Sequence, residues 1–452
     1  MKTKVGMISL GCPKNQCDAE LMLHKLVSAG FEPVEDIAKA DCAIVNTCGF
    51  IESAKAESIE EIIELGKLKP EGVIKAIVVT GCMAERYRDE ILENMPEVDA
   101  VCGIGANSDI VEVCRAALSG ERLSRYGKKE DMPLDGGRVQ TTPPYYAYLR
   151  VADGCDNRCT YCAIPGIRGG FRSRKPENII EEAKNLAKNG VKELVIVAQD
   201  TTRYGDDLGG DYRLPELLDD LCLIDGIEWI RLLYCYPDRV TDKLLDTMAR
   251  QPKICKYMDI PLQHCNADVL KAMNRRGDKE SLLALIRKIR EKVPGITLRT
   301  TLMVGFPGET RKQFTELCEF VREAKFERLG CFVWSAEEGT AAYDLPDRVS
   351  EKEANRRQEI IMEEQSRCVD EWCESMEGKI IPVIVEGYDR IAGCCYGRSE
   401  MDAPDVDCKV FFSTDGKKLT AGDIVNIGIG DRMDCDLVGS LCEDGQEAED
   451  SE

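Results

Sequence analysis

Histidine is nearly absent from this chain, whose 452 residues include only His24 and His264. A zinc site that combines a cysteine pair with several histidines is therefore hard to build. Long apolar runs are also missing, and no stretch approaches the ~20 apolar residues of a membrane-spanning helix. The N-terminus enters a β-rich run at once, without the apolar region or cleavage site of a signal peptide. These absences predict a soluble, cytoplasmic protein with no membrane partner.

Positive charge is in deficit as well, because 60 Lys and Arg stand against 82 Asp and Glu, which gives a formal net charge of −22. Binding to nucleic acid phosphates draws on a surplus of Lys and Arg, so this composition disfavours a large nucleic-acid footprint. It favours a basic partner instead. The length predicts two or three domains rather than one core.

Cysteine, in contrast, is abundant, with 23 residues. Secreted disulfide scaffolds are short and dense in cysteine, and this long chain without a secretion signal does not resemble them. Most of the cysteines are therefore expected to be reduced thiols. The remaining question is which of them bind a metal.

Three cysteines stand within eight residues, in the run Gly154-Cys-Asp-Asn-Arg-Cys-Thr-Tyr-Cys162. Three thiolates, here Cys155, Cys159 and Cys162, can hold three irons of a cubane 4Fe–4S cluster and leave the fourth iron without a protein ligand. An open iron of this kind allows S-adenosylmethionine to bind and to be cleaved reductively to a carbon radical. The spacing therefore predicts a reaction class as well as a metal.

Two other interpretations of this triad fit the sequence less well. A structural zinc site takes four ligands, whereas only Cys159 and Cys162 form a Cys-x-x-Cys pair here. Packing of three small thiols on one helix face is disfavoured by Gly154, Asn157 and Pro165, which make a regular helix improbable. The iron–sulfur interpretation is favoured over both.

A second set of cysteines ends three successive β-rich runs in the first 125 residues. Cys12, Cys48 and Cys82 are 36 and 34 residues apart, and each is followed by a helical stretch. Alternating strands and helices predict a parallel sheet, in which strands end at one common edge and ligands bind there. A single cysteine at such a place is usually a buried small side chain. Three in equivalent positions predict a second three-thiolate cluster.

The predicted fold class is α/β, with three structured segments. The expected units are an α/β domain with a parallel sheet at 1–125, a linker at 126–144, an open or partial (β/α) barrel at 145–376, a small antiparallel β-barrel at 377–442 and an acidic tail at 443–452. Candidate strands of the central segment are 146–151, 193–198, 229–234, 257–260, 297–304 and 328–334. Gly305-Phe-Pro-Gly-Glu309 follows one of them, where it either helps to seat a cofactor or starts a helix.

The C-terminal segment is acidic, with twelve Asp and Glu against seven Lys and Arg over 377–442. Small barrels often bind RNA, but this charge has the wrong sign for that role. We expect Asp402, Asp405 and Asp407 to face a basic protein surface, or else to be merely solvated. The tail at 443–452 contains six acids and is expected to be disordered.

Taken together, these features resemble the radical S-adenosylmethionine methylthiotransferases, whose third domain is a TRAM-like barrel. The resemblance covers essentially the whole chain except the acidic tail. Leu10-Gly-Cys-Pro-Lys-Asn15, Thr47-Cys-Gly-Phe-Ile51, Cys162-Ala-Ile-Pro, Val197-Ala-Gln-Asp-Thr-Thr-Arg-Tyr204 and the stretch 397–407 resemble the branch that modifies a ribosomal protein aspartate. Departures are Cys17, where an aliphatic residue is usual, and Cys394-Cys395. Neither alters the six ligand positions.

The resemblance implies a division of labour between two 4Fe–4S clusters. The cluster on Cys155, Cys159 and Cys162 binds S-adenosylmethionine and yields a 5′-deoxyadenosyl radical, which removes hydrogen from the β-carbon of an aspartate of small-subunit ribosomal protein twelve. The cluster on Cys12, Cys48 and Cys82 carries the sulfur that is methylated and transferred. The reaction needs an electron donor such as flavodoxin or ferredoxin, and the sulfur donor is left open.

Two rival functions remain. A tRNA adenosine methylthiotransferase is disfavoured by Pro13-Lys14, where the tRNA branch usually has Gln-Met, and by the acidic barrel, so tRNA is not the expected partner. The other rival is a non-catalytic iron–sulfur protein that binds ribosomes or RNA. Cleavage of S-adenosylmethionine by the reduced protein separates the enzyme from the binding protein.

Overall fold

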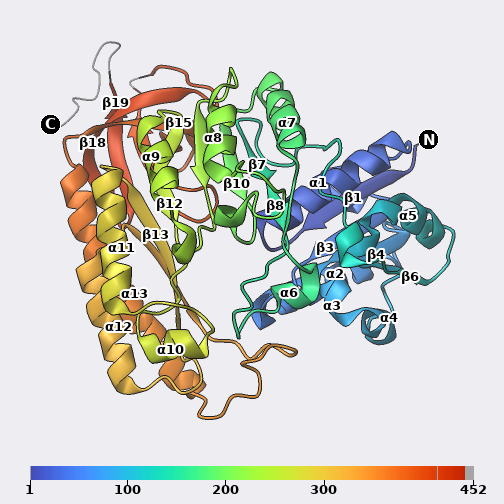
Figure 1. Cartoon of the computed structure of the whole chain (residues 1–452). Coiled ribbons are helices and arrows are strands. Elements are labelled where there is room, and N and C mark those ends of the chain that lie inside the picture. Colours follow the sequence, from blue (N-terminus) through green and yellow to red (C-terminus); the bar gives the residue numbers. More distant parts are fainter. Residues whose placement is uncertain (1, 415, 443–452) are drawn as a thin grey trace.

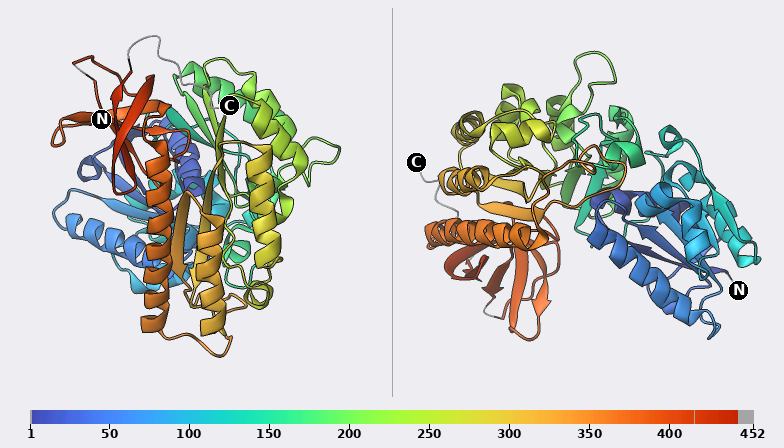
Figure 2. Two further views of the ribbon diagram at one scale, coloured as in Figure 1. Left: turned by 90° about the vertical axis from the view of Figure 1, so that its left-hand side faces the viewer. Right: turned by 90° about the horizontal axis from the view of Figure 1, so that it is seen from below.

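The computed structural model describes residues 2–414 and 416–442, so the expected acidic tail at 443–452 lies outside the described residues. Two six-stranded sheets and a closed barrel follow one another along the chain (Figure 1), and a small sheet pairs β8 (Ala152–Asp153) with β9 (Arg172–Ser173). In Figure 2 the N-terminal domain and the C-terminal barrel are separate bodies, joined through the central domain. Within the described residues, none of the helices has the length and apolar character needed to cross a bilayer.

The N-terminal domain is a parallel sheet of six strands in the order β2-β1-β3-β4-β5-β6. Its strands are β1 (Lys4–Ser9), β2 (Glu32–Pro33), β3 (Cys42–Thr47), β4 (Ala76–Gly81), β5 (Ala100–Cys102) and β6 (Leu123–Arg125). Its helices are α1 (Pro13–Ser28), α2 (Glu52–Leu68), α3 (Cys82–Tyr87), α4 (Asp89–Asn94) and α5 (Ile110–Leu118), with short 3₁₀ turns at Ile37–Lys39 and Ile104–Asp109. β3 and β4 are buried along their whole length, as expected for parallel strands covered on both faces.

The central domain is an open parallel sheet of six strands in the order β14-β13-β12-β11-β10-β7. Its strands are β7 (Tyr146–Arg150), β10 (Glu193–Val197), β11 (Trp229–Leu232), β12 (Ile254–Asp259), β13 (Thr297–Val304) and β14 (Arg328–Val333). Its helices are α6 (Ile164–Arg168), α7 (Pro176–Lys188), α8 (Leu214–Cys222), α9 (Asp242–Arg250), α10 (Ala267–Ala272), α11 (Lys279–Lys292), α12 (Arg311–Ala324) and α13 (Glu351–Met376). All six expected strands are present, and the open barrel is confirmed.

The C-terminal domain is a closed barrel in the order β15-β16-β17-β19-β18. Its strands are β15 (Ile380–Asp389), β16 (Cys394–Ser399), β17 (Val410–Ser413), β18 (Ile424–Met433) and β19 (Asp436–Leu441). The small barrel was expected from the sequence, with short apolar runs at 380–385, 409–412, 424–428 and 435–438 as its strands. β16 was not expected, and one strand pair differs from the expected antiparallel pattern. β17 and β19 run parallel, with Val410 opposite Leu437.

The two faces of the central sheet are covered differently. Helices pack on one face around a large apolar core. The other face carries aromatic side chains such as Tyr148 and Tyr257, which pack against Cys17 of α1 and against Ile384 and Ala403 of the C-terminal domain. The segment after β16 thus fills the side of the open sheet that its helices leave uncovered.

The acids expected to face a basic partner bind the central domain instead. Asp402 is buried and accepts hydrogen bonds from Arg328 at 2.6 and 3.0 Å. Asp407 accepts from the Tyr257 hydroxyl at 2.6 Å, and the more exposed Asp405 accepts from the hydroxyls of Tyr146 and Tyr148 at 3.1 and 3.2 Å. The expectation was wrong because each acid meets a donor on a distant strand, which the local sequence does not reveal.

Asp402→Asn is therefore expected to lower the free energy of unfolding by about 3 kcal/mol, because it leaves the buried Arg328 guanidinium without a counter-charge. Urea unfolding followed by tryptophan fluorescence measures the loss, and one of the three tryptophans, Trp372, lies at the site, because the Arg328 guanidinium is 4.3 Å from the centroid of its ring. Asp434→Asn, at an exposed position with positive φ that asparagine tolerates, is the matched control. Equal urea midpoints for the two variants would contradict the assignment.

Candidate iron–sulfur centres

The three N-terminal cysteines meet at one edge of the first sheet. Cys12 directly precedes α1, Cys48 directly follows β3, and Cys82 opens α3 immediately after β4. The preceding strands β1, β3 and β4 are neighbours in parallel register. Their carboxyl ends therefore lie side by side, and the sheet brings these three residues together as the strand pattern predicted.

Glycines allow the three loops to approach closely. A Cβ on Gly11 would lie 2.9 Å from the Cys48 sulfur. A Cβ on Gly49 would lie 2.7 Å from the backbone nitrogen of Met83, next to Cys82. Real Cβ atoms do not come so near to other heavy atoms, and Gly11 also has a φ of 90°, so both positions require glycine if the cysteine loops are to touch.

Asn15 ties the same loops together. Its side-chain amide donates to the carbonyl of Leu10 at 3.0 Å and to that of Thr47 at 2.8 Å. Its Oδ1 lies 3.5 Å from the Cys82 sulfur. Asn15 is buried, so this one side chain satisfies backbone groups next to two of the cysteines while it contacts the third.

The thiols of this triad suit a cationic ligand. Burial raises the pKa of Cys82 to about 12 and also raises the pKa of Cys48. The guanidinium of Arg168 opposes this rise at both thiols. Because thiolates bind metal and a bound metal favours their deprotonation, three converging thiols beside a buried arginine fit an iron–sulfur cluster.

Gly49→Ala is expected to remove the iron held by this triad, about four atoms per chain, while the central triad keeps its own. The added methyl must push the Cys48 and Cys82 loops apart. Iron and sulfide analysis after anaerobic reconstitution measures the loss. Gly430→Ala serves as the control, because nothing lies within 4 Å of its added Cβ. Full iron content in the Gly49 variant would show that the loops need not touch.

The central triad lies in an irregular loop between the short strand β8 (Ala152–Asp153) and α6. Gly154 and Arg158 have φ values of 77° and 52°, which excludes a regular helix through Cys155 and Cys159, in agreement with the sequence analysis. All three thiols are partly exposed. Burial raises the pKa of Cys155 to about 11 and that of Cys162 to about 12.

The loop between α10 and α11 holds this triad in place. Thr160 donates its backbone N–H to the Met273 carbonyl at 3.1 Å and its hydroxyl to the Ala272 carbonyl at 2.8 Å. Arg275 places a guanidinium nitrogen 3.9 Å from the Cys159 sulfur and stacks on Tyr236 at 4.4 Å. The positive charge of Arg275 favours thiolates and offsets part of the cost of burial.

A buried network links the two triads. Arg168 donates to Asn15 Oδ1 at 2.7 Å and to Asp18 at 2.8 Å in the N-terminal domain. Its other nitrogen donates to Asp153 at 2.8 Å, and Asp153 accepts from the backbone N–H of Gly154 at 2.7 Å. A continuous path therefore runs from the Cys82 sulfur to the residue before Cys155.

A second contact between the domains lies beside Cys12. The Lys14 ammonium lies 3.3 Å from the centroid of the Tyr234 ring, which follows β11. Tyr234 has a φ of 61°, and its backbone N–H donates to Asp259. Lys14 is buried, and despite this burial its contact with Tyr234 raises the pKa of the ammonium. The loop after Cys12 is thus fixed against the central sheet.

The Gly305–Glu309 stretch was expected either to help seat a cofactor or to start a helix. Glu309 of Gly305-Phe-Pro-Gly-Glu309 is buried, accepts from the backbone N–H of Gly305 and pairs with Arg357 at 3.4 Å, and Thr310 caps α12. The structure thus supports helix initiation for this stretch.

Cys17 is buried in the core with its sulfur 3.7 Å from the Tyr148 carbonyl, which makes it a packing residue.

The sequence analysis missed Asn15, Arg168, Tyr234 and Arg275. Asn15 had a signal, since it stands in the Pro13-Lys14-Asn15 stretch after the first cysteine. The arginines had none, because Arg168 and Arg275 lie 6 and 113 residues beyond Cys162 without a distinguishing pattern.

Segment 126–144, expected as a linker, makes specific contacts with both neighbouring domains. Arg138 within it donates a hydrogen bond to Glu182 at 2.7 Å and also pairs with Glu20.

Three family descriptions match the chain. "Radical SAM superfamily" matches residues 149–321, "Uncharacterized protein family UPF0004" residues 4–103, and "TRAM domain" residues 378–442. The ribosomal protein uS12 methylthiotransferase RimO of Desulforamulus reducens is 47% identical over 97% of this chain and 99% of its own length. That of Caldanaerobacter subterraneus subsp. tengcongensis is 48% identical over 96% and 99%.

The chain belongs to the RimO family. It is a radical S-adenosylmethionine methylthiotransferase, and its radical SAM domain implies one 4Fe–4S cluster together with S-adenosylmethionine. The solved structure of the radical S-adenosylmethionine methyltransferase TsrM from Kitasatospora setae has a TM-score of 0.58 and 15% identity, and the match covers 76% of this chain and 77% of that one. At this identity the likeness concerns the fold alone.

Proposed function

We propose that this member of the RimO family attaches a methylthio group to the β-carbon of an aspartate of ribosomal protein uS12, using two 4Fe–4S clusters. The relatives are named for uS12, and they match nearly the whole chain. The observation that carries the two-cluster proposal is the buried network of Asn15, Arg168 and Asp153, which connects the two cysteine loops. Hydrogen removal and sulfur transfer must act on one carbon, so the two loops must face a shared substrate.

In this proposal Cys155, Cys159 and Cys162 hold the cluster that binds S-adenosylmethionine, and Cys12, Cys48 and Cys82 hold the cluster that carries sulfur. When bound, the first supplies the radical and the second the sulfur. The chain's own residues position the ligands. Arg275 holds a positive charge against Cys159, and Arg168 does the same for the N-terminal thiols while it fixes both loops.

The expected partners follow from charge and chemistry. A ribosomal protein is basic, and the net charge of −22 favours its approach. The acids that remain free for this role do not include Asp402 or Asp407, which are occupied by Arg328 and Arg299. Reductive cleavage also requires a low-potential electron donor of the flavodoxin or ferredoxin class. A ribosomal substrate implies a cytoplasmic enzyme.

The test is to give the reconstituted, reduced chain both substrates. Ribosomes and tRNA from a strain without methylthiotransferases are incubated with the chain and S-adenosylmethionine, and both products are analysed by mass spectrometry. We expect a methylthio group on one aspartate of uS12 and an unmodified tRNA. A methylthio group on a tRNA adenosine, with uS12 unchanged, would overturn the proposal in favour of the tRNA-modifying rival.

A further inference from the structure

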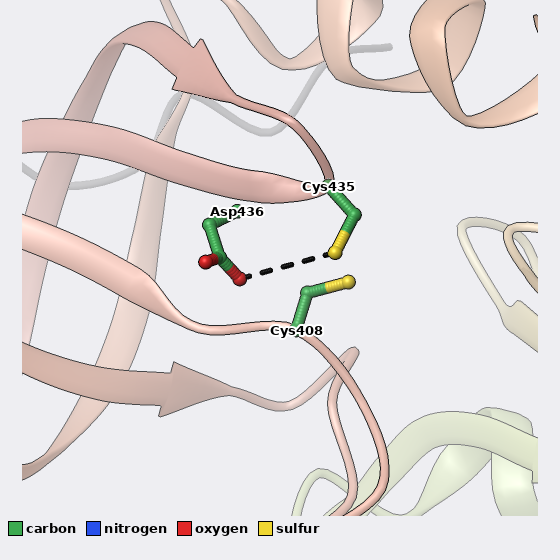
Figure 3. Close-up of side chains that lie close together, drawn as sticks. All are labelled: Cys408, Cys435 and Asp436. Carbon is green, nitrogen blue, oxygen red and sulfur yellow. Dashed lines mark hydrogen bonds between the residues drawn. The ribbon is translucent and has the colours of Figure 1, made fainter. Parts of the chain in front are cut away.

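A group of possible metal ligands lies in the C-terminal barrel, remote in the fold from the two cysteine triads. The sulfurs of Cys408 and Cys435 and a carboxylate oxygen of Asp436 all lie within 4.8 Å of one another (Figure 3). All three side chains are partly exposed. Within residues 2–414 and 416–442, no other group of three His, Cys, Asp or Glu side chains brings its ligand atoms so close.

The parallel pair of strands builds this group. Val410 of β17 lies opposite Leu437 of β19, and Cys408 and Cys435, which each stand two residues earlier in the chain, are brought together just before the two strands begin. The two sulfurs and the Asp436 carboxylate point toward one another at the place where these strands start (Figure 3). An antiparallel pair, as the sequence analysis expected, would have separated these two residues to opposite ends of the ladder.

The carboxylate is oriented by the backbone. Asp436 Oδ1 accepts a hydrogen bond from the N–H of Lys409 at 2.7 Å, and this oxygen lies 4.0 Å from the Cys435 sulfur. The Lys409 carbonyl accepts in turn from Leu437 at 3.0 Å. A hydrogen bond of this kind fixes the direction of a carboxylate ligand, as the outer contacts of metal sites do.

A positive charge lies beside the two sulfurs. The hydrogen bond between them lowers the pKa of Cys435 and raises that of Cys408, so it shifts a proton within the pair and does not free both thiolates. The Arg328 guanidinium favours the thiolate form of both residues, which suits a site that holds two thiolates against a metal ion.

The site is accessible from solvent. Cys408 and Cys435 line a groove of about 870 Å³ between α13, β14 and the barrel, together with Arg328, Asp370 and Asp434. A metal ion can therefore enter without unfolding of the barrel. Thiolates prefer soft and borderline ions over Mg²⁺ or Ca²⁺, and Zn²⁺ accepts sulfur and carboxylate oxygen in one tetrahedral set.

We propose that Cys408, Cys435 and Asp436 bind one Zn²⁺ ion, with a water molecule as the fourth ligand. Binding releases the thiol protons of Cys408 and Cys435 to solvent and joins the starts of β17 and β19. Cys408 directly follows the segment with Asp402 and Asp407 that docks on the central sheet. The ion therefore fixes the end of the docking segment, and its binding should raise the melting temperature of the chain.

The test uses the full chain, reconstituted with iron and sulfide under reducing conditions, equilibrated with one equivalent of Zn²⁺ and passed through a desalting column. Metal analysis is expected to find about one zinc in addition to the full iron content. Zinc-edge X-ray absorption should show two sulfur neighbours at about 2.3 Å and oxygen at about 2.0–2.2 Å. The sulfur number distinguishes this site from zinc that has replaced iron on a three-cysteine triad.

Variants assign the ligands. The double variant Cys408→Ser and Cys435→Ser is expected to lose the zinc while it keeps all its iron. The matched control, Cys394→Ser with Cys395→Ser in the same barrel, is expected to keep both. Should the first variant fail to fold, Asp436→Asn retains the acceptor for Lys409 and is expected to raise the dissociation constant for Zn²⁺.

Three results would overturn the proposal. The first is a parent chain with full iron and no retained zinc. The second is equal zinc in the parent and in the folded Cys408 and Cys435 double variant, or an unchanged dissociation constant in the Asp436 variant. The third is a zinc-edge spectrum with three or four sulfur neighbours, which would place the ion on a cluster triad.

Discussion

Alanine at Cys12, Cys48 and Cys82 together is expected to abolish methylthio transfer while cleavage of S-adenosylmethionine to 5′-deoxyadenosine stays measurable. The reason is the separation of the ligands between two domains: these thiols follow β1, β3 and β4 of the first sheet, and the other triad follows β8. Removing the first set leaves the second complete. Iron content should fall from about eight to about four atoms per chain.

The measurement combines liquid chromatography of 5′-deoxyadenosine with mass spectrometry of uS12. A matched triple variant replaces three other thiols of the same domain that are fully buried, namely Cys42, Cys102 and Cys114. That control should retain its iron and its transfer activity if it folds. The separation of roles fails if 5′-deoxyadenosine disappears in a folded Cys12, Cys48 and Cys82 variant that still holds about four irons.

The reciprocal variant, with alanine at Cys155, Cys159 and Cys162, is expected to lose every product. Without these ligands no iron is presented for S-adenosylmethionine at the central loop, so neither 5′-deoxyadenosine nor methylthio-aspartate should form. Iron should again fall to about four atoms per chain, now held by the N-terminal triad. A loss of at least a thousandfold in 5′-deoxyadenosine is about 4 kcal/mol of activation free energy.

The control for the central domain replaces Cys265, Cys318 and Cys331, which are buried there and remote in sequence from the loop. It should keep all its iron and its product if it folds. Zinc instead of iron in the reconstituted parent, or an unchanged iron content in the Cys155, Cys159 and Cys162 variant, would contradict the assignment of this triad to a cluster.

The sequence was sufficient for those parts of the fold that depend on local periodicity. The apolar runs at β3, β4 and β10 are buried along their whole length and carry their own signal. The cysteine positions relative to the strand ends followed from the same pattern, because parallel strands bring their carboxyl ends to one edge. That reasoning needed no knowledge of distant contacts.

The parts that the sequence did not predict depend on partners in other domains. β16 contains Arg398, and a charged residue in a short segment favours the prediction of a loop. In the structure the Arg398 guanidinium is buried and lies 2.7 Å from the Glu193 carboxylate of β10. Arg168 is likewise buried, and one of its two counter-charges, Asp18, stands 150 residues earlier in the N-terminal domain. Local patterning cannot show a charge whose counter-charge is more than a hundred residues away.

The acidic segment after β16 also determines whether the barrel is interchangeable. A chain cut after Met376 would uncover Arg231 and Arg328, which are buried against Glu400 and Asp402 of the missing part. A barrel grafted from an unrelated protein would close the sheet only if it supplied acids opposite Arg299 and Arg328 and covered Tyr257. The C-terminal barrel is therefore specific to this central domain and cannot be exchanged for an unrelated barrel.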